Sequence, residues 1–357
     1  MRSLSRIANT AVCILSTLVC AAVVLLAQPL PASAQTTLRF GTVFSPTTST
    51  YLMLVEACRR IEAETAATEA VAIDIRTAGE FGKPTELLKL VDNGDIEIAY
   101  TVQGYSPARF SASSVMELPL VRRTAVGGTR ALWELYESGK LDRDYAGLKV
   151  VGLWALPAYG IFTAQRPLGS PRDLRGLRVR NPSKTVGRAM AKLGMVPVAL
   201  PLNFMGTGLK DGLIDGISYG WYSSTTTAGA DGQPVMGQLK NLLDIPFSGP
   251  VVMLAMKRAT FDALPAPVRA AIDKHLGKTA SLAIAEERDQ AEEEVKRKLA
   301  GDGRHAVLRF DPVQMADIRE ELEEVYADWV GGMADQGQDG KALLDAARKA
   351  IAAAEKP

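Results

Sequence analysis

The sequence has few residues that could staple the chain or bind a metal: three cysteines and two histidines in 357 positions. Cys13 and Cys20 fall in an N-terminal segment that we expect to be removed, which leaves Cys58 as the single thiol of the mature chain. A disulfide needs two cysteines, and a structural zinc site needs four ligands close together. The sequence therefore predicts no disulfide framework, no metal and no other cofactor. Cys58 lies on the apolar side of a predicted helix, so we expect it in the core.

An excess of charge of one sign is also lacking, because 41 basic residues are balanced by 40 acidic residues. The segment expected to be removed carries two arginines and no acid, which leaves 39 basic residues against 40 acidic ones. The sequence has neither a basic stripe nor a lysine-rich tail. Nucleic acids and anionic membranes attract proteins through such features, so we expect neither as a partner.

The first 34 residues have the pattern of a cleaved signal peptide. Arg2 and Arg6 precede a largely apolar run, 11–27, and Ala32-Ser33-Ala34 is a suitable signal-peptidase site. The run is rather long for a signal peptide, so the alternative is an uncleaved membrane anchor. We predict cleavage before Gln35. The remaining chain of about 320 residues is long enough to bury a core without disulfides.

Residues 176–221 show the clearest secondary-structure pattern in the chain. Three apolar stretches in this segment are typical of short strands: 177–180, 196–200 and 213–217. Helices are predicted between them, with Ser183 as a candidate cap of the first and Asn203 of the second. Strands joined by helices in this way are normally parallel. We therefore predict an open α/β sheet, in which ligands bind beyond the carboxyl ends of the strands.

Arg180 lies at the carboxyl end of the first of these strands. A guanidinium group at such a place can hold a carboxylate through two parallel hydrogen bonds, which makes arginine well suited to binding acids. From the residues alone, the alternative is an arginine exposed to water, which is the usual environment of this residue type.

Several motifs around Arg180 resemble those of one family. They are DLRGLRVRNPS at 173–183, LGMVPVALP at 193–201 and GLKDGLIDG at 208–216, and smaller matches such as Glu117-Leu118-Pro119-Leu120 follow the same order. The mature chain thus resembles the extracytoplasmic solute-binding proteins of TRAP transporters, of the DctP type. The resemblance implies a two-lobed α/β periplasmic binding protein fold, type II-like, with the ligand cleft between the lobes and a long C-terminal helix spanning both.

The resemblance also implies a function and a partner. Arg180 matches the arginine that forms the main salt bridge to the ligand carboxylate in this family. We therefore expect a periplasmic, monomeric binding protein, not an enzyme, that delivers an organic acid to the membrane permease subunits of a TRAP transporter. Delivery to another transport system or to a signalling receptor is the alternative.

The chain then divides into a signal peptide and four further parts. These are 1–34, signal peptide; 35–155, first part of lobe 1; 156–248, lobe 2 with the ligand-anchoring arginine; 249–264, return to lobe 1; and 265–357, the long spanning helix, a short strand and C-terminal helices. Within the last part, the charged run AEERDQAEEEVKRK is typical of a solvated helix face.

Further pocket residues follow from their positions in the family. They are Ser183, Leu202 and Tyr219 in lobe 2, and Val102 and Tyr105 in lobe 1. Arg166 lies where many members carry a second basic residue near the ligand, and its alternative role is a surface arginine near the hinge.

The chain departs from the family at several aromatic positions. Phe204 stands where many relatives have an acidic residue, and Tyr219, followed closely by Trp221, stands where many have a polar one. A pocket lined by these rings favours an aromatic or bulky monocarboxylate over a C4-dicarboxylate or another small acid. The alternative is that the rings pack in the core of the lobe.

One catalytic motif also occurs. Gly216-Ile217-Ser218-Tyr219-Gly220 fits the G-x-S-x-G pattern of serine hydrolases, and His275 and His305 occur later in the chain. That motif should feed directly into a helix, whereas we predict a polar loop over 223–234. A secreted serine hydrolase that uses Ser218 is therefore a remote alternative.

Overall fold

A computed structural model describes residues 36–355, apart from 69, 78 and 201. The predicted signal peptide, 1–34, lies outside the described residues. Except for Thr36, all the elements named below belong to one compact unit, 37–357. Within the described part of the chain, no helix is both long and apolar enough to cross a membrane.

The first lobe is built on a five-stranded sheet in the order β2-β1-β3-β10-β4. Its strands are β1 (Thr36–Gly41), β2 (Val71–Arg76), β3 (Ile98–Val102), β4 (Leu148–Ala155) and β10 (Val251–Lys257). Its helices are α2 (Ser49–Thr65), α3 (Leu87–Asn93), α4 (Ala125–Glu137), α8 (Arg258–Asp262) and α9 (Ala266–Leu276), with the short 3-10 helices η1 (Gln103–Tyr105) and η2 (Ser113–Glu117). Strand β10 runs antiparallel to both β3 and β4, so the chain comes back to this sheet after β9.

The second lobe is built on a six-stranded sheet in the order β11-β9-β5-β8-β6-β7. Its strands are β5 (Tyr159–Thr163), β6 (Arg178–Asn181), β7 (Val196–Ala199), β8 (Gly216–Tyr219), β9 (Asn241–Ser248) and β11 (Ala306–Leu308). Its helices are α5 (Lys184–Lys192), α6 (Met205–Lys210) and α7 (Trp221–Thr226), with the 3-10 helices η3 (Pro171–Leu174), η4 (Leu202–Phe204) and η5 (Val235–Gln238). Strand β6 is parallel to β7 and β8, as the alternation of strands and helices predicted.

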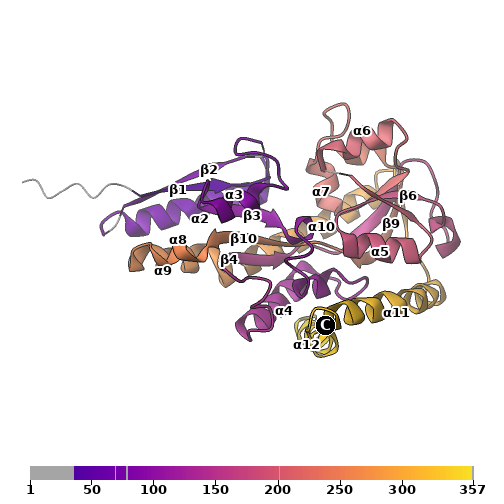
Figure 1. Ribbon diagram of the computed structural model, residues 1–357. Coiled ribbons are helices and arrows are strands. Elements are labelled where there is room, and N and C mark those ends of the chain that lie inside the picture. Colours follow the sequence, from indigo (N-terminus) through magenta and orange to yellow (C-terminus); the bar gives the residue numbers. More distant parts are fainter. Residues whose placement is uncertain (1–35, 69, 78, 201, 356–357) are drawn as a thin grey trace, which may run out of the picture. The chain divides into compact units, whose positions relative to one another are not determined.

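Two crossover segments connect the sheets, 156–158 between β4 and β5 and 249–250 between β9 and β10. They contact each other, because the Leu156 amide donates to the Pro250 carbonyl over 3.0 Å. The chain ends with three long helices: α10 (Lys278–Ala300), α11 (Pro312–Ala334) and α12 (Gly340–Ala354). Helix α10 packs on α4 and β4 of the first lobe and on α7 of the second, so it spans both lobes as expected (Figure 1).

Local sequence signals explain many of the element ends. The Thr48 hydroxyl caps α2 by accepting from the Tyr51 amide, and the Ser183 hydroxyl caps α5 by accepting from the Val186 amide. Gly94 ends α3 in the left-handed conformation, with φ of 86°, which glycine adopts without a steric penalty. Cys58 is buried in the core beneath α2, as predicted, and burial raises the pKa of its thiol to about 12.

Two sequence predictions were wrong in this part of the chain. Strand β9 was not predicted at all, and the segment after Trp221 was predicted as a loop although α7 begins there. The short strand β8 also begins at Gly216, after the apolar residues at 213 and 214. The predicted helix beyond Pro265 is present, but Gly277 divides it into α9 and α10.

Candidate functional site

Arg180 lies in β6, between β7 and β8, and only 4% of its surface is exposed. Its Nε donates to the Leu200 carbonyl over 3.1 Å. Among the described residues, neither Nη1 nor Nη2 has a hydrogen-bond partner, and no carboxylate pairs with the guanidinium. Burying a charge without a counter-ion is costly. The site is therefore suited to an anion supplied from outside the chain.

Four tyrosines lie near this guanidinium or near one another: Tyr100, Tyr105, Tyr159 and Tyr219. Tyr219 of β8 lies beneath Arg180, with the guanidinium carbon 5.9 Å from the ring centre. Tyr159 of β5 contacts Tyr219 edge to face, with ring centres 5.3 Å apart. Burial raises the pKa values of Tyr105, Tyr159 and Tyr219, and the nearby Arg180 charge opposes the increase in each case. All three phenols are therefore close to this arginine.

Tyr100 of β3 belongs to the same group. Burial raises its pKa well above the ordinary value, and the neighbouring Tyr105 and Tyr219 phenols add to the increase. Tyr100 and Tyr105 come from the first lobe, whereas Tyr159 and Tyr219 come from the second. We use the name tyrosine chamber for the group formed by Arg180 and these four tyrosines.

The hydroxyl groups of the tyrosine chamber are mostly without partners. The Tyr219 hydroxyl bonds the Thr227 hydroxyl at 2.9 Å. For Tyr100, Tyr105 and Tyr159, the described part of the chain offers the hydroxyl no hydrogen-bond partner. Three phenol hydroxyls and two guanidinium nitrogens are therefore available to bond a polar ligand.

Ser183 lies between the lobes but already has partners. Its hydroxyl donates to Glu117 Oε2 over 2.6 Å and accepts from the Val186 amide. Glu117 also accepts from the Val251 amide beside the second crossover, and burial raises the pKa of this carboxyl. The predicted role of Ser183 as a direct ligand contact is therefore not supported by its bonding, and Ser183 instead joins the two lobes.

A cavity of about 310 Å³ lies beside Ser183, between η1, η2, α5 and α11. Its lining includes Gln103, Glu117 and Ser183 but not Arg180. Gly104 approaches Ser183 so closely that an added Cβ would lie 2.7 Å from the serine Cβ. The lobes are thus in close contact here.

The other residues that the sequence predicted to line the pocket range from buried in the core to exposed on the surface. Leu202 and Val102 are partly buried and pack against the apolar cores of the second and first lobes, respectively. Trp221 is only 1% exposed, and its ring contacts Phe162 with centres 4.8 Å apart, so it packs in the core. Phe204 is 51% exposed.

Arg166 does not join Arg180. It follows the last residue of β5, Thr163, which pairs with Gly216 at the start of β8. Tyr219 lies at the other end of β8, where it pairs with Gly160. Arg166 is exposed and donates through Nη2 to the Arg175 carbonyl over 3.1 Å. It therefore lies toward the opposite end of the sheet from the tyrosine chamber, and we leave it out of the proposed site.

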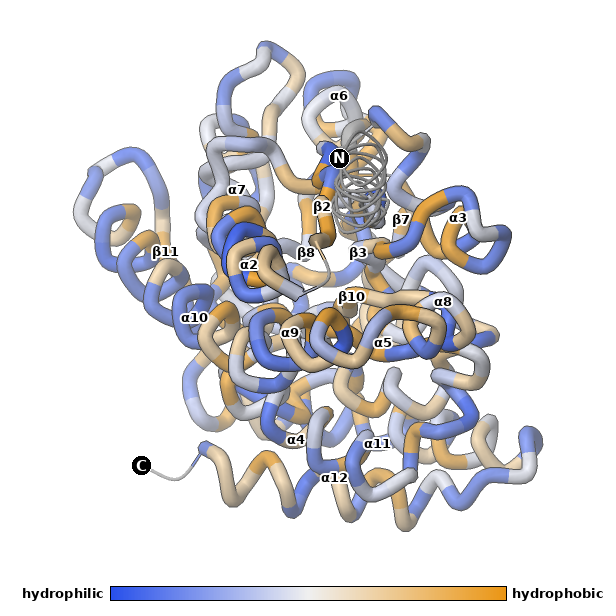
Figure 2. The backbone as a smooth tube through the Cα atoms, turned by 90° about the vertical axis from the view of Figure 1, so that its left-hand side faces the viewer, coloured by the Kyte–Doolittle hydropathy of each residue, from blue (hydrophilic) through white to orange (hydrophobic). Residues whose placement is uncertain are grey.

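Helix α10 contradicts the prediction of a purely solvated charged face. Its tube is mostly hydrophilic in Figure 2, yet Arg288 and Glu292 are buried. Glu292 accepts from the Trp221 and Tyr222 amides, at 2.6 and 3.2 Å, at the start of α7. One turn earlier, Asp289 accepts from the Ala125 and Val126 amides at the start of α4. Two acids of one helix thus cap one helix in each lobe.

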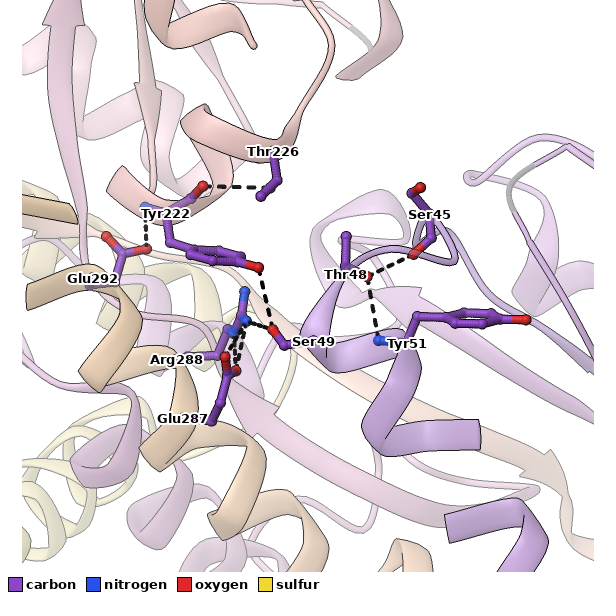
Figure 3. Close-up of polar contacts among 9 residues, drawn as sticks. All are labelled: Ser45, Thr48, Ser49, Tyr51, Tyr222, Thr226, Glu287, Arg288 and Glu292. Atoms are coloured by element: carbon purple, nitrogen blue, oxygen red, sulfur yellow. Dashed lines mark hydrogen bonds and ion pairs between the residues drawn. The ribbon is translucent and has the colours of Figure 1, made fainter. Parts of the chain in front are cut away.

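Arg288 adds a polar contact between the lobes (Figure 3). It pairs with Glu287, donates to the Ser49 hydroxyl at the start of α2, and stacks on Tyr222 of α7 with 4.0 Å between its guanidinium carbon and the ring centre. The Ser49 and Tyr222 hydroxyls also bond each other at 3.4 Å. Sequence reasoning missed this cluster, as it missed Tyr100 and Tyr159.

Arg122 holds the two crossover segments. It is buried and donates to three carbonyls: from Nε to Met116 over 3.1 Å, from Nη1 to Leu156 over 2.6 Å and from Nη2 to Gly249 over 2.8 Å. Burial lowers the pKa of Arg122 to about 10. This arginine thereby connects both crossovers to the first lobe.

The catalytic triad that a serine hydrolase requires is not assembled among the described residues. Ser218 is fully buried in β8, and its hydroxyl has no partner within the part of the chain that the structure describes. His275 bonds Glu64 and His305 bonds Asp302, so both histidines have other partners. The sequence argument from a polar loop after the motif was nevertheless wrong, because β8 does lead into α7.

Two α/β lobes joined by two crossover segments and spanned by one long helix define the class of two-lobed solute-binding proteins. The chain belongs to bacterial extracellular solute-binding protein family 7, DctP, whose family model matches residues 40–331. The resemblance to TRAP solute-binding proteins is thereby confirmed.

Individual relatives are distant in sequence and similar in fold. The chain is 24% identical over 343 residues to the outer membrane transporter protein TsaT of Comamonas testosteroni, covering 94% of this chain and 97% of that protein. A TRAP solute-binding protein from an unidentified marine microbe, specific for aromatic acids, was solved with metahydroxyphenylacetate. It superposes with a TM-score of 0.80 at 23% sequence identity, and the match covers 90% of this chain and 100% of that protein. A TRAP solute-binding protein from Rhodoferax ferrireducens, solved with copurified benzoate, superposes with a TM-score of 0.79 at 24% sequence identity. The match covers 89% of this chain and 98% of that protein.

Proposed function

We propose that this protein binds an aromatic monocarboxylate in the tyrosine chamber, with Arg180 paired to the carboxylate. The observation that carries this proposal is the buried Arg180 guanidinium, whose two terminal nitrogens have no partner within the described part of the chain. A carboxylate offers two oxygens in the geometry that these nitrogens match. The surrounding phenol rings would stack against an aromatic ligand ring.

The charge pattern favours one carboxylate over two. A dicarboxylate would gain from a second unpaired cation, but the buried arginines Arg288 and Arg122 are both bonded already, Arg288 to Glu287 and Ser49 and Arg122 to three carbonyls. The aromatic acids bound by the two similar TRAP proteins agree with this reading. Val102 and Leu202 would provide apolar surface at the edge of the site.

In the cell, the protein would act in the periplasm after removal of its signal peptide, and it would deliver the acid to TRAP permease subunits. Contacts from both lobes would favour the closed state to the extent that the ligand binds this state better than the open one. We expect it to act as a monomer and without catalysis.

A thermal-shift screen of the periplasmic protein tests the ligand class. The panel should contain benzoate, phenylacetate and mandelate, with succinate and malate as C4-dicarboxylates and glucuronate as a sugar acid. A ligand at about 100 times its Kd adds roughly 2.7 kcal/mol of stability, which raises Tm by several degrees. Stabilisation by the aromatic acids alone would support the proposal. Stabilisation by succinate or malate in place of the aromatic acids would refute it.

A further inference from the structure

The tyrosine chamber contains more hydrogen-bonding groups than one carboxylate can use. Arg180 offers two unpaired nitrogens, which match the two oxygens of a carboxylate. Three hydroxyls, those of Tyr100, Tyr105 and Tyr159, remain without partners in the described residues. These hydroxyls can bond further polar atoms, so the surplus points to such atoms on the ligand.

The positions of these hydroxyls divide them into two groups. The Arg180 charge acts on Tyr105 and on Tyr159, so both phenols lie near the place where the carboxylate would bind. Tyr100 lies in β3 of the first lobe, and its ring contacts Phe44 and Trp154. Arg180 lies in β6 of the second lobe, over the Tyr219 ring. Tyr100 therefore borders the first-lobe side of the chamber, whereas the carboxylate would bind on the second-lobe side.

The surroundings of Tyr100 suit a ring with a neutral polar substituent. The Phe44 and Trp154 rings lie 4.6 and 5.9 Å from the Tyr100 ring, so the hydroxyl stands among aromatic surfaces. The indole Nε1 of Trp154 is a second buried polar atom there without a partner among the described residues. Arg288 is held by Glu287 and Ser49 and leaves no unpaired cation for a second anion.

We propose that Tyr100 is a specificity-determining residue, whose hydroxyl bonds an uncharged polar group on the ligand ring, remote from the carboxylate. The substrate class is then a hydroxylated aromatic monocarboxylic acid rather than an unsubstituted one. A phenol can donate and accept, so it matches a ligand hydroxyl in either direction. The inference rests on the proposed function, because it takes the carboxylate to be bound at Arg180.

Isothermal titration with matched ligands tests this assignment. The full chain is exported with its own signal peptide, purified from the periplasm, and freed of copurified ligand by unfolding and refolding. Kd is measured for benzoate and for two pairs of equal size, 3-hydroxybenzoate with 3-methylbenzoate and 4-hydroxybenzoate with 4-methylbenzoate. The readout is the ratio of Kd values within each pair, for wild type, Tyr100→Phe and the matched control Tyr105→Phe.

We expect wild type to prefer the hydroxylated member of at least one pair by about fivefold or more, since a site built around a hydroxyl rejects the analogue that lacks it. Tyr100→Phe should bring this ratio close to one, whereas Tyr105→Phe should weaken both members and leave the ratio unchanged. The Tm of ligand-free Tyr100→Phe should not fall, because the variant breaks no hydrogen bond among the described residues.

Two results would overturn the inference and can be told apart. If wild type binds benzoate but shows no preference within either pair, or if Tyr100→Phe keeps the preference, Tyr100 does not set specificity and the proposed function still stands. If none of the five acids binds wild type, the proposed function and the inference both fail.

Discussion

Two buried arginines of this protein have opposite bonding states. Arg122 is 2% exposed and Arg180 is 4% exposed, so burial alone does not distinguish them. Arg122 uses Nε, Nη1 and Nη2 to bind three carbonyls, two of them in or beside the crossover segments. Arg180 uses only Nε, and its two terminal nitrogens have no partner within the described residues.

The difference indicates what each arginine is for. A buried guanidinium whose nitrogens are bonded to the backbone stabilises the fold, because it satisfies carbonyls that would otherwise be buried without donors. A buried guanidinium with unpaired nitrogens lowers the stability of the ligand-free protein and gains its partner from a ligand. The same substitution at the two positions should therefore affect different properties.

Arg122→Met should show the largest effect, a loss of about 5 kcal/mol in the free energy of unfolding, because three buried carbonyls lose their donor at about 1–3 kcal/mol each. Urea unfolding followed by circular dichroism measures this loss. If the variant does not fold, Arg122→Lys, which retains part of the bonding, should fold with reduced stability. A stability of Arg122→Met within 1 kcal/mol of wild type would contradict the assignment.

Arg180→Met should act on affinity and not on stability. We expect Kd for an aromatic acid to rise on the order of a thousandfold, or about 4 kcal/mol, because the buried carboxylate loses its only cation. The ligand-free variant should keep or exceed the wild-type Tm, since an unpaired buried charge is removed. Titration calorimetry and thermal unfolding measure the two quantities. A variant that binds within a few-fold of wild type would remove Arg180 from the site.

Glu292 extends the comparison to a buried acid that is bonded to backbone amides. Burial raises its pKa from 4.5 to about 7, so the folded protein keeps this proton where the unfolded chain has released it. The resulting contribution to stability is complete below pH about 4.5 and is lost as pH rises to about 7. Between pH 5 and 7.5, wild type should lose about 2 kcal/mol that Glu292→Gln does not lose.

Urea unfolding at both pH values measures the effect of Glu292. The control is Glu293→Gln on the same helix, whose side chain is exposed and pairs with Lys296. Its stability should follow the wild-type pH dependence. Equal pH dependence in wild type and Glu292→Gln would show that Glu292 does not titrate in this range.

The fold of the second lobe was largely predictable because its signals are local. Apolar strands, the Ser183 cap and the intervening glycines in 176–221 specify elements whose ends the structure reproduces within a few residues. Strand β9, which the sequence analysis did not predict, contains Pro246, and proline is unusual inside a strand. The structure tolerates this proline where the pairing register with β5 shifts between Tyr159 and Ile161.

The tyrosine chamber was predictable only in part because it forms from distant segments. Arg180, Tyr105 and Tyr219 followed from family motifs. Tyr100 and Tyr159 lie in different sheets, and only the folded arrangement of the two lobes brings them close to the other residues of the chamber. The capping roles of Asp289 and Glu292 in α10 had no signal in the sequence, since their partners are backbone amides of α4 and α7 rather than complementary side chains.

Arg166 is an exposed arginine and can be compared with the two buried ones. Its substitution should have the smallest effect on affinity and stability. It is exposed and bonded to a single carbonyl, so water can replace the protein at most of its nitrogens. Arg166→Met should change Kd for an aromatic acid by less than about twofold and the free energy of unfolding by less than about 0.5 kcal/mol. The same calorimetric and urea measurements apply. A tenfold loss of affinity would show that Arg166 reaches the ligand, and it would restore the second basic contact that the family resemblance suggested.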